Sequence, residues 1–321
     1  MILVIKLGAL GDFILSDSAF KVIRDMHRGE KIVLLTTPAF EEFGQTLGYF
    51  DEVVSLPRFK YWDIKGWWKL IRFFNTHEFD RVYDLQMVGR TKKYYRVLKL
   101  FAKKPFEWIG HIKGAKVYLE KKYFSKHVSD RIKRLFSKLG ITEIPQLNIT
   151  RLGEPIHVEG LEGPYVLIIP SASNAYKGAK IWPLIFYRDI VKHLIDAGYK
   201  VVLIGGPADD HSLLRIHKDV FDLTGKTSLY QIIELAKNAT FAFGGDTGPM
   251  HMAAASKCPV FQLFSLKVLP AERVGARAPH YYHFETDDLK TLHPDEVWDE
   301  VLLFLKKLAE NKIKPSHTPA L

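Results

Sequence analysis

The sequence has a single cysteine and no long apolar run, and each absence excludes a class of protein. Cys258 alone forms no internal disulfide and no cysteine metal site, and no stretch approaches the roughly 18 apolar residues of a membrane-spanning helix. The apolar N-terminal stretch has no basic segment before it and is interrupted by Lys6 and Asp12, so we do not expect it to be a signal peptide. These features predict a soluble cytoplasmic protein.

Acidic residues are scarce in one half of the chain only. The 321 residues contain 46 Lys and Arg against 36 Asp and Glu, a net charge of +10. Residues 1–155 hold 28 basic and 17 acidic residues, a net charge of +11, whereas residues 156–321 sum to −1. Between Arg58 and Lys138 the net charge reaches +15. This excess predicts an anionic partner for the first half: a phosphorylated or acidic substrate, a membrane surface or nucleic acid.

Short apolar runs alternate with helix-like apolar spacing along the chain, a pattern typical of parallel βαβ units. The pattern restarts after a stretch rich in glycine and proline, residues 151–164. It predicts an α/β protein with two doubly wound domains, residues 1–155 and 156–321, whose ligands bind at the carboxyl ends of the strands. The expected strands are residues 2–5, 31–36, 53–56, 81–85, 165–170, 200–204, 240–243 and 259–263. The expected helices are residues 13–28, 40–47, 64–74, 186–197, 229–238, 249–256 and 294–309.

A glycine turn follows the first expected strand, with Gly8 and Gly11 just before Asp12. The spacing is not GxGxxG, so a nicotinamide or flavin cofactor is not expected. Glycines at such a turn let a substrate approach the backbone closely. Asp12 then either accepts a proton from an attacking hydroxyl or caps the following helix.

A second glycine turn, Gly244-Gly245-Asp246-Thr247-Gly248, joins the strand ending near Phe243 to a helix. Free backbone N–H groups at a helix N-terminus bind phosphate. Thr247 and His251 are potential donors to phosphate oxygens, and Asp246 is an acceptor for sugar hydroxyls. The alternative is a capped structural helix with His251 in the core.

The strand at residues 165–170 runs into Ser171 and Ser173, followed by Lys177 and Lys180. Hydroxyls directly after a strand, with a lysine a few residues on, suit a diphosphate. The alternative is an exposed loop with surface lysines.

Each of two basic stretches in the first half of the chain has two possible interpretations. Residues 64–74 mix tryptophan and phenylalanine with cations, as membrane-surface helices do, but an ordinary core helix with solvated lysines has the same composition. Arg90, Lys92 and Lys93 follow Asp84-Leu85-Gln86 at a strand's carboxyl end. They either bind anionic groups of an acceptor or simply begin a charged helix.

Together these segments resemble, in order and over essentially the whole chain, the glycosyltransferase family that includes the bacterial heptosyltransferases. The likeness rests on the GxxGD turn ending at Asp12, on Lys180-Ile181-Trp182-Pro183, and on Asp246-Thr247-Gly248-Pro249-Met250-His251. It implies a GT-B fold of two Rossmann-like domains, with the acceptor bound by the first and the nucleotide-sugar by the second. It also implies inverting transfer from an ADP-activated sugar without a metal or other cofactor.

The resemblance also implies roles for individual residues. Asp12 is the expected general base, and Lys180 offsets charge on the departing ADP, a role for which Lys177 competes. The expected donor-binding residues are Ser171, Ser173, Lys180, Gly206, Asp209, Gly245, Asp246, Thr247, Gly248 and His251. The expected acceptor-binding residues are Gly8, Gly11, Gln86, Arg90, Lys92 and Lys93. The C-terminal helix, residues 294–309, is expected to pack back across the domains.

The expected function is therefore transfer of a sugar, heptose from ADP-heptose, onto an acidic glycolipid such as the lipopolysaccharide inner core. The enzyme is expected in the cytoplasm, peripherally on the inner face of the membrane, and not on nucleic acid. Two alternatives stay open: a basic nucleic-acid-binding protein without catalysis, and a nucleotide-sugar epimerase on the same fold. The position of the excess charge favours an acceptor that is anionic, membrane-borne or both.

Overall fold

The computed structural model describes residues 1–171 and 175–310, which divide into two compact units, residues 1–147 and residues 148 onwards. The boundary lies eight residues before the expected division at 155/156. Residues 148–155 belong to the second unit because their backbone bonds to it: the Ile149 N–H donates to the Ala255 carbonyl (3.0 Å) and the Glu154 N–H to the Tyr230 carbonyl (3.2 Å). The glycine- and proline-rich stretch is therefore not itself the division.

Each unit contains one six-stranded parallel sheet, and the two sheets have the same topology. The orders are β3-β2-β1-β4-β5-β6 and β9-β8-β7-β10-β11-β12. This is the Rossmann order, in which strands are added toward one edge of the sheet from the first to the third strand and toward the other edge from the fourth. The strands of the first unit are β1 (Ile2–Ile5), β2 (Ile32–Thr36), β3 (Glu52–Ser55), β4 (Arg81–Asp84), β5 (Glu107–Gly110) and β6 (Val117–Tyr118). Those of the second are β7 (Tyr165–Ile169), β8 (Lys200–Leu203), β9 (Val220–Asp222), β10 (Phe241–Gly245), β11 (Val260–Ser265) and β12 (Tyr281–Thr286).

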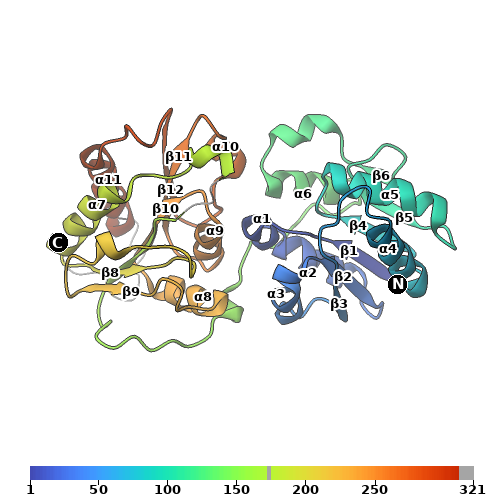
Figure 1. The fold of residues 1–321 in the computed structure, drawn as a ribbon, viewed down its shortest axis with the longest axis horizontal. Helices are drawn as coiled ribbons and strands as arrows, with labels where there is room; N and C mark the ends of the chain where they lie inside the picture. The colour runs from blue at the N-terminus through green and yellow to red at the C-terminus, as the bar shows by residue number, and fades with distance from the viewer. Residues whose placement is uncertain (172–174, 311–321) are drawn as a thin grey trace. The chain divides into compact units, whose positions relative to one another are not determined.

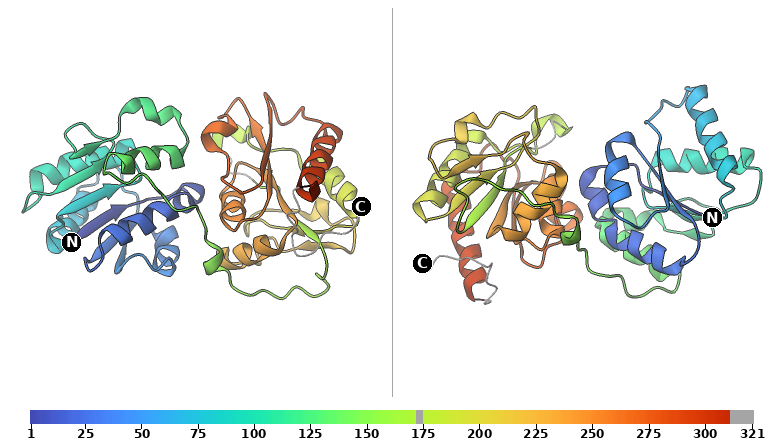
Figure 2. Two further views of the ribbon diagram at one scale, coloured as in Figure 1. Left: turned by 180° about the vertical axis from the view of Figure 1, so that it is seen from behind. Right: turned by 90° about the horizontal axis from the view of Figure 1, so that it is seen from below.

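Helices cover both faces of each sheet (Figures 1 and 2). Those of the first unit are α1 (Leu10–Ile14), α2 (Asp17–Met26), α3 (Glu41–Thr46), α4 (Ile64–His77), α5 (Gly89–Phe101) and α6 (Val128–Ser137). Those of the second are α7 (Leu184–Asp196), α8 (Leu229–Asn238), α9 (Gly248–Ala255), α10 (Ala271–Val274) and α11 (Pro294–Glu310). Short 3-10 helices lie at Pro38–Phe40, Lys121–Ser125, Thr150–Leu152, Ala175–Gly178 and Ser212–Leu214. No helix in the described ranges is long and apolar enough to cross a membrane.

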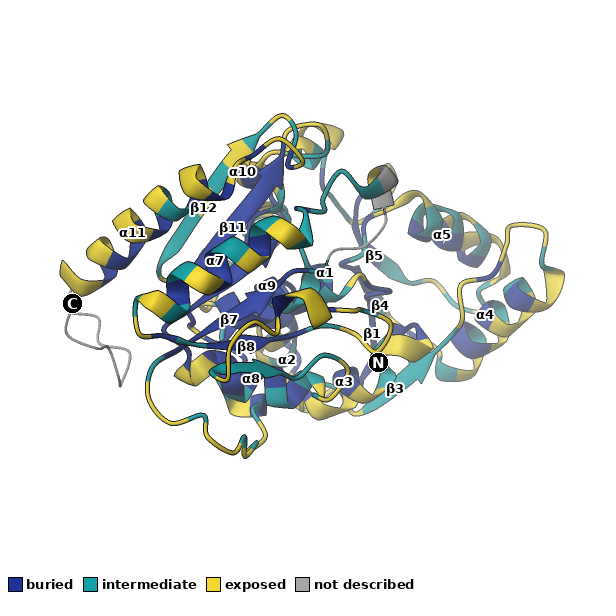
Figure 3. Cartoon of the chain, turned by 60° about the vertical axis from the view of Figure 1, so that its left-hand side comes forward, coloured by how far each residue is buried: buried dark blue, intermediate teal, exposed yellow. Residues whose placement is uncertain are grey.

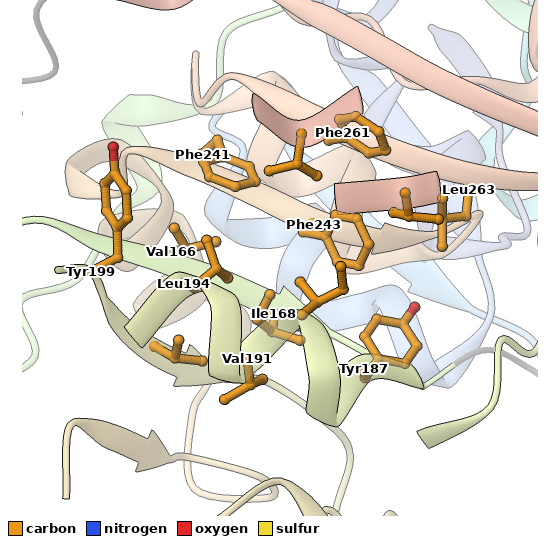
Figure 4. Close-up of a cluster of buried hydrophobic side chains, with 14 of the residues drawn as sticks. Val166, Ile168, Tyr187, Val191, Leu194, Tyr199, Phe241, Phe243, Phe261 and Leu263 are labelled. Carbon is orange, nitrogen blue, oxygen red and sulfur yellow. The ribbon is translucent and has the colours of Figure 1, made fainter. Parts of the chain in front are cut away.

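The second unit has a separate core on each face of its sheet, because successive strand residues point to opposite faces. Val166 and Ile168 of β7 pack with α7 and α11, whereas Leu167 and Ile169 pack with α8 and α9. Figure 4 shows the first core, where Phe243 lies beside Tyr187 with ring centroids 5.7 Å apart. The central strands are buried on both faces, and the edge strand β12 is only partly covered (Figure 3). The C-terminal helix α11 packs on α7 in this core.

One expected helix is broken in the structure. Apolar spacing predicted a single helix over residues 13–28, but α1 ends at Ile14 and α2 begins at Asp17. The Ser16 hydroxyl donates to the Asp12 carbonyl at 2.8 Å, and serine back-bonding of this kind bends helices. The break leaves α1 as a short segment directly after β1, with Asp12 in its first turn.

Candidate functional site

Three loops of the second unit leave the same edge of its sheet. Strand β7 lies between β8 and β10, and all three are parallel, so their carboxyl ends are adjacent. Ser171 follows β7, Gly206 follows β8 and Asp246 follows β10. Ligands of doubly wound sheets bind at this edge, where the strand order reverses between β7 and β10.

The Asp246 carboxylate is at the centre of this edge and contacts the side chains of Lys180 and His251. Its Oδ2 accepts a hydrogen bond from the Lys180 ammonium, and its Oδ1 lies 3.5 Å from Nε2 of His251. Burial alone would raise the pKa of the Asp246 carboxyl, but His251 and Lys180 outweigh burial and hold that pKa below its usual range. Asp246 is therefore ionised at neutral pH, and Lys180 is held at the sheet edge.

Two polar atoms beside Asp246 are buried and have no hydrogen-bond partner among the described residues: Oγ1 of Thr247 and Nδ1 of His251. Buried polar atoms are rarely left unsatisfied without a functional reason. Both belong to the N-terminus of α9, whose first backbone N–H groups point out of the helix. Gly245 precedes them, and a Cβ added there would lie 3.3 Å from the Lys180 carbonyl, a tight approach. These groups suit an anionic ligand with several oxygen acceptors.

The loops after β7 and β8 are joined by a buried histidine. Nε2 of His211 lies 2.8 Å from the Ser171 hydroxyl, and its Nδ1 lies 2.8 Å from Oγ1 of Thr224. Burial lowers the pKa of His211, against the opposing charge of Asp209 and other nearby acids. Asp209 itself accepts a bond from the Gly206 N–H at 2.7 Å, which shapes the turn after β8. Ser173 lies outside the described residues.

In the first unit, the glycine turn after β1 positions Asp12. Gly8 has a φ of +104°, and an added Cβ would collide with the Phe40 ring, so only glycine fits. Asp12 is half-buried in the first turn of α1, next to buried Gly11, and its carboxylate forms no hydrogen bond among the residues the structure describes. The carboxylate is thus not used as a helix cap.

A buried lysine lies beneath this turn. Lys6 is 2% exposed and donates to the Leu85 carbonyl at 3.2 Å. Burial lowers the pKa of Lys6, and the negative charge of Asp12 opposes this most strongly. Asp84 at the end of β4 is 1% exposed, and burial raises its pKa to about 6 against bonds from the Met87 N–H and Thr91. The carboxyl ends of β1 and β4 therefore bury a lysine and an aspartate, Lys6 and Asp84, near Asp12.

Of the four expected acceptor residues around β4 and α5, Arg90 and Lys93 lie together at the Tyr61 ring, whereas Gln86 and Lys92 lie elsewhere. Gln86 accepts a bond from the Leu7 N–H at 2.8 Å and so joins the ends of β1 and β4. Arg90 donates to the Phe59 carbonyl at 2.7 Å, and the Lys93 ammonium lies 3.0 Å from the centre of the Tyr61 ring. Lys92 points elsewhere, into a pocket on another side of α5.

This pocket, here called the α5 pocket, has a volume of about 710 Å³ and a strongly basic lining. The lining contains five cations and no carboxylate, and none of the five forms an ion pair in the described ranges. The lining residues are Lys92, Tyr95, Arg96, Lys99, Leu100, His111, Ile112, Lys113, Tyr118 and Lys121. Unpaired cations around a concave surface attract polyanions.

His111 forms the buried wall of the α5 pocket. Its Nδ1 donates to the Leu119 carbonyl at 2.5 Å. Burial lowers the pKa of His111, the bond to Leu119 opposes this, and the charges of Lys92 and Lys121 add to the lowering. His111 is therefore neutral at neutral pH.

Sequence reasoning missed several of these groups. Lys6 interrupts an apolar strand, and a lone cation in such a run was a signal for a buried charge. Arg96 and Lys99 follow the predicted Lys92 at helical spacing, which also marked one face of α5. His111 and Lys121 join that face only through the strand order, which no local pattern reveals.

Two parallel six-stranded sheets of Rossmann order, each flanked by helices, are the architecture of the GT-B glycosyltransferases. The sequence model of glycosyltransferase family 9 (heptosyltransferase) matches residues 67–268, and the chain belongs to this family. The matched range contains Lys180 and Asp246 but not Asp12.

Individual relatives agree with the family assignment. Lipopolysaccharide heptosyltransferase 3 of Escherichia coli (strain K12) is 29% identical over 153 residues, which are 43% of this chain and 44% of the relative. The chain thus aligns with less than half the length of that relative. The family 9 glycosyl transferase of Veillonella parvula DSM 2008 superposes with a TM-score of 0.76 at 20% identity, covering 95% of this chain and 97% of that one. Escherichia coli heptosyltransferase WaaC with ADP-2-deoxy-2-fluoro heptose gives a TM-score of 0.72 at 18% identity, covering 94% and 99%.

Proposed function

We propose that this protein is an inverting, metal-independent glycosyltransferase that moves a sugar, heptose from ADP-heptose, onto an acidic glycolipid such as the lipopolysaccharide inner core. The observation that carries the proposal is the Asp246 group. A carboxylate held between Lys180 and His251, with Thr247 Oγ1 and His251 Nδ1 unpartnered at the start of α9, suits a sugar diphosphate. The solved relative that contains ADP-2-deoxy-2-fluoro heptose supports the same donor class.

In this mechanism the second unit binds the donor. The α9 N-terminus, Thr247 and His251 donate to the diphosphate, and Ser171 is oriented toward it by His211. Asp246 accepts from a sugar hydroxyl. As the bond from the anomeric carbon to the diphosphate breaks, the electron pair stays on the departing ADP, whose added charge Lys180 stabilises. The lysine and the helix end supply the positive charge that this step requires.

The first unit binds the acceptor and activates its hydroxyl. Asp12 accepts the hydroxyl proton while the oxygen attacks the anomeric carbon from the face opposite the diphosphate, which inverts that carbon. Lys6 lies buried beneath the turn after β1, where it interacts electrostatically with Asp12. The α5 pocket binds phosphate or carboxylate groups of the acceptor through Lys92 and the neighbouring cations. The same acidic glycolipid places the enzyme on the inner face of the membrane.

The direct test is incubation with ADP-heptose and a deacylated, water-soluble core acceptor, with ADP release and the anomeric configuration of the product as readouts. Asp12→Asn should lower kcat at least about 100-fold while leaving donor affinity by calorimetry nearly unchanged. Asp17→Asn, at the start of α2, is the control. Absence of ADP release from any ADP-sugar and of UDP release from any UDP-sugar contradicts the proposal, and normal turnover of Asp12→Asn removes Asp12 as the base.

Two further assays address the alternatives. An epimerase converts a nucleotide-sugar without any acceptor. Analysis of the products formed when no acceptor is present therefore identifies epimerase activity. Binding of RNA at moderate salt in a gel-shift assay would favour the nucleic-acid alternative, since non-specific binding weakens steeply with salt.

A further inference from the structure

Large apolar side chains stand in solvent at the start of α4 and in the turn before it. Trp62 is 75% exposed, Ile64 81% and Trp68 57%. Single exposed apolar residues are ordinary, but three large ones within seven positions mark an interaction surface. We call Trp62, Ile64 and Trp68, together with the nearby cations Lys60, Lys65, Lys69 and Arg72, the α4 surface.

The two faces of α4 differ sharply. Leu70, Phe73 and Phe74 are buried against the first sheet. The inner face of α4 is therefore that of an ordinary core helix. Ile64 and Trp68 are four residues apart and therefore lie in one row on the outer face. Folding of the unit does not require these outer apolar side chains.

The turn that carries Trp62 is held firmly. Asp63 accepts a bond from the Gly66 N–H at 3.0 Å and caps α4, and the Trp67 indole N–H donates to the Tyr61 carbonyl at 2.8 Å. Gly66 has no room for a side chain, because a Cβ there would run into the Phe59 ring. Trp62 is thus presented in a fixed position, and binding costs little ordering.

Cations surround the apolar side chains without neutralising partners. The Lys60 ammonium lies 5.3 Å from the centre of the Trp62 ring, and the Arg72 guanidinium lies 5.2 Å from that of Trp68. None of the four cations of the α4 surface forms an ion pair within the described part of the chain. The one acidic residue in the segment, Asp63, is used as the helix cap. Tryptophan beside unpaired lysine and arginine is the composition of interfacial membrane anchors.

We propose that the α4 surface docks the protein on an anionic phospholipid bilayer, with Trp62, Ile64 and Trp68 entering the headgroup region and the four cations contacting lipid phosphates. The inference rests on the proposed function, because an enzyme that acts on a lipid-borne acceptor must reach the membrane surface that carries it. It does not depend on catalysis, however, since vesicles without acceptor suffice to test it. The alternative occupant of this surface is a second copy of the chain.

The test is co-sedimentation of the full chain with vesicles of phosphatidylcholine, with or without one quarter phosphatidylglycerol. We expect binding to the anionic vesicles and little to the neutral ones. Lys65→Gln/Lys69→Gln should weaken anionic binding roughly 20-fold, because each basic residue near such a surface contributes about a fivefold factor. Trp62→Ser/Ile64→Ser/Trp68→Ser should abolish it. Leu302→Ser/Leu303→Ser, which alters two half-exposed leucines of α11, is the matched control and should bind normally.

Three results would overturn the docking proposal: no binding of the wild type to anionic vesicles, unchanged binding of the triple serine variant, or a dimer in solution that the triple variant dissociates while vesicle binding persists. Transfer to the water-soluble acceptor separates the two proposals. The triple variant should retain that activity. Loss of vesicle binding without loss of transfer therefore supports the docking proposal and leaves the proposed function unaffected. Absence of transfer by the wild type would contradict the proposed function but not the docking proposal.

Discussion

Replacing Lys180 by methionine separates the structural and chemical roles of the Lys180–Asp246 pair. The two side chains are 16% and 13% exposed, so the pair is nearly buried. Removing one partner of such a pair costs about 3 to 5 kcal/mol, because the other charge is left uncompensated. His251 still lies 3.5 Å from Asp246, and we therefore expect the low end, about 3 kcal/mol. For a unit of this size that lowers Tm by roughly 6 to 12 °C.

The double variant Lys180→Met/Asp246→Asn removes the stranded charge and should recover most of the lost stability. It should not recover transfer, because Lys180 is then still absent from the departing diphosphate. We expect kcat to fall about 100- to 1000-fold in both variants. Urea unfolding and ADP release are the two readouts. Lys237→Met breaks a more exposed pair with Glu234 in the same unit and should cost less than about 1 kcal/mol.

Three outcomes would refute this reasoning. If Lys180→Met unfolds like the wild type, the pair does not hold the sheet edge. If the double variant is no more stable than Lys180→Met, the loss comes from packing and not from an uncompensated charge. If the double variant regains transfer along with stability, Lys180 acts only through Asp246 and not on the leaving group.

Two further predictions concern the first unit. Burial raises the pKa of Asp84 to about 6, so the contribution of Asp84 to stability is fully present below the unfolded value near pH 4 and is lost as pH rises through 6. Asp84→Asn, which does not ionise, should gain about 2 kcal/mol relative to the wild type between pH 4 and pH 8 by urea unfolding, and the opposite trend would contradict the pKa. Lys92→Gln/Arg96→Gln should raise KM for the core acceptor about tenfold or more with kcat little changed. The control Lys103→Gln/Lys133→Gln should leave KM unchanged. If both variants raise KM equally, the acceptor responds to the overall positive charge of the unit and does not bind specifically in the α5 pocket.

The sequence was most informative where strands are buried on both faces. Central strands of a parallel sheet read as continuous apolar runs, so β1, β7 and β10 and the turns after them were predictable. The edge strands β6, β9 and β12 are only partly covered, and their mixed composition carries no such signal. The position of a residue after a central strand is therefore the strongest sequence indicator of a site residue in this fold.

Side-chain partners were less predictable than positions. Asp246, Thr247 and His251 were expected near one ligand, but nothing in the sequence indicated that Asp246 binds Lys180, which lies 66 residues earlier. Arg90 and Lys92, both expected to bind the acceptor, lie on different sides of α5. Residues two apart on a helix point about 200° apart, so Arg90 reaches the loop at Phe59 while Lys92 lines the α5 pocket.

The net charge of +10 is a sum over places with different chemistry. Five unpaired cations line the α5 pocket and four lie on the α4 surface, and the two exposed tryptophans of the described residues, Trp62 and Trp68, accompany only the second group. A single-stranded nucleic acid needs stacking platforms and cations along one continuous track. If such a track were present, substitutions in either group would weaken RNA binding together. If the two groups serve an acceptor and a bilayer separately, the pocket variant changes acceptor KM and not vesicle binding, and the α4 variant does the reverse.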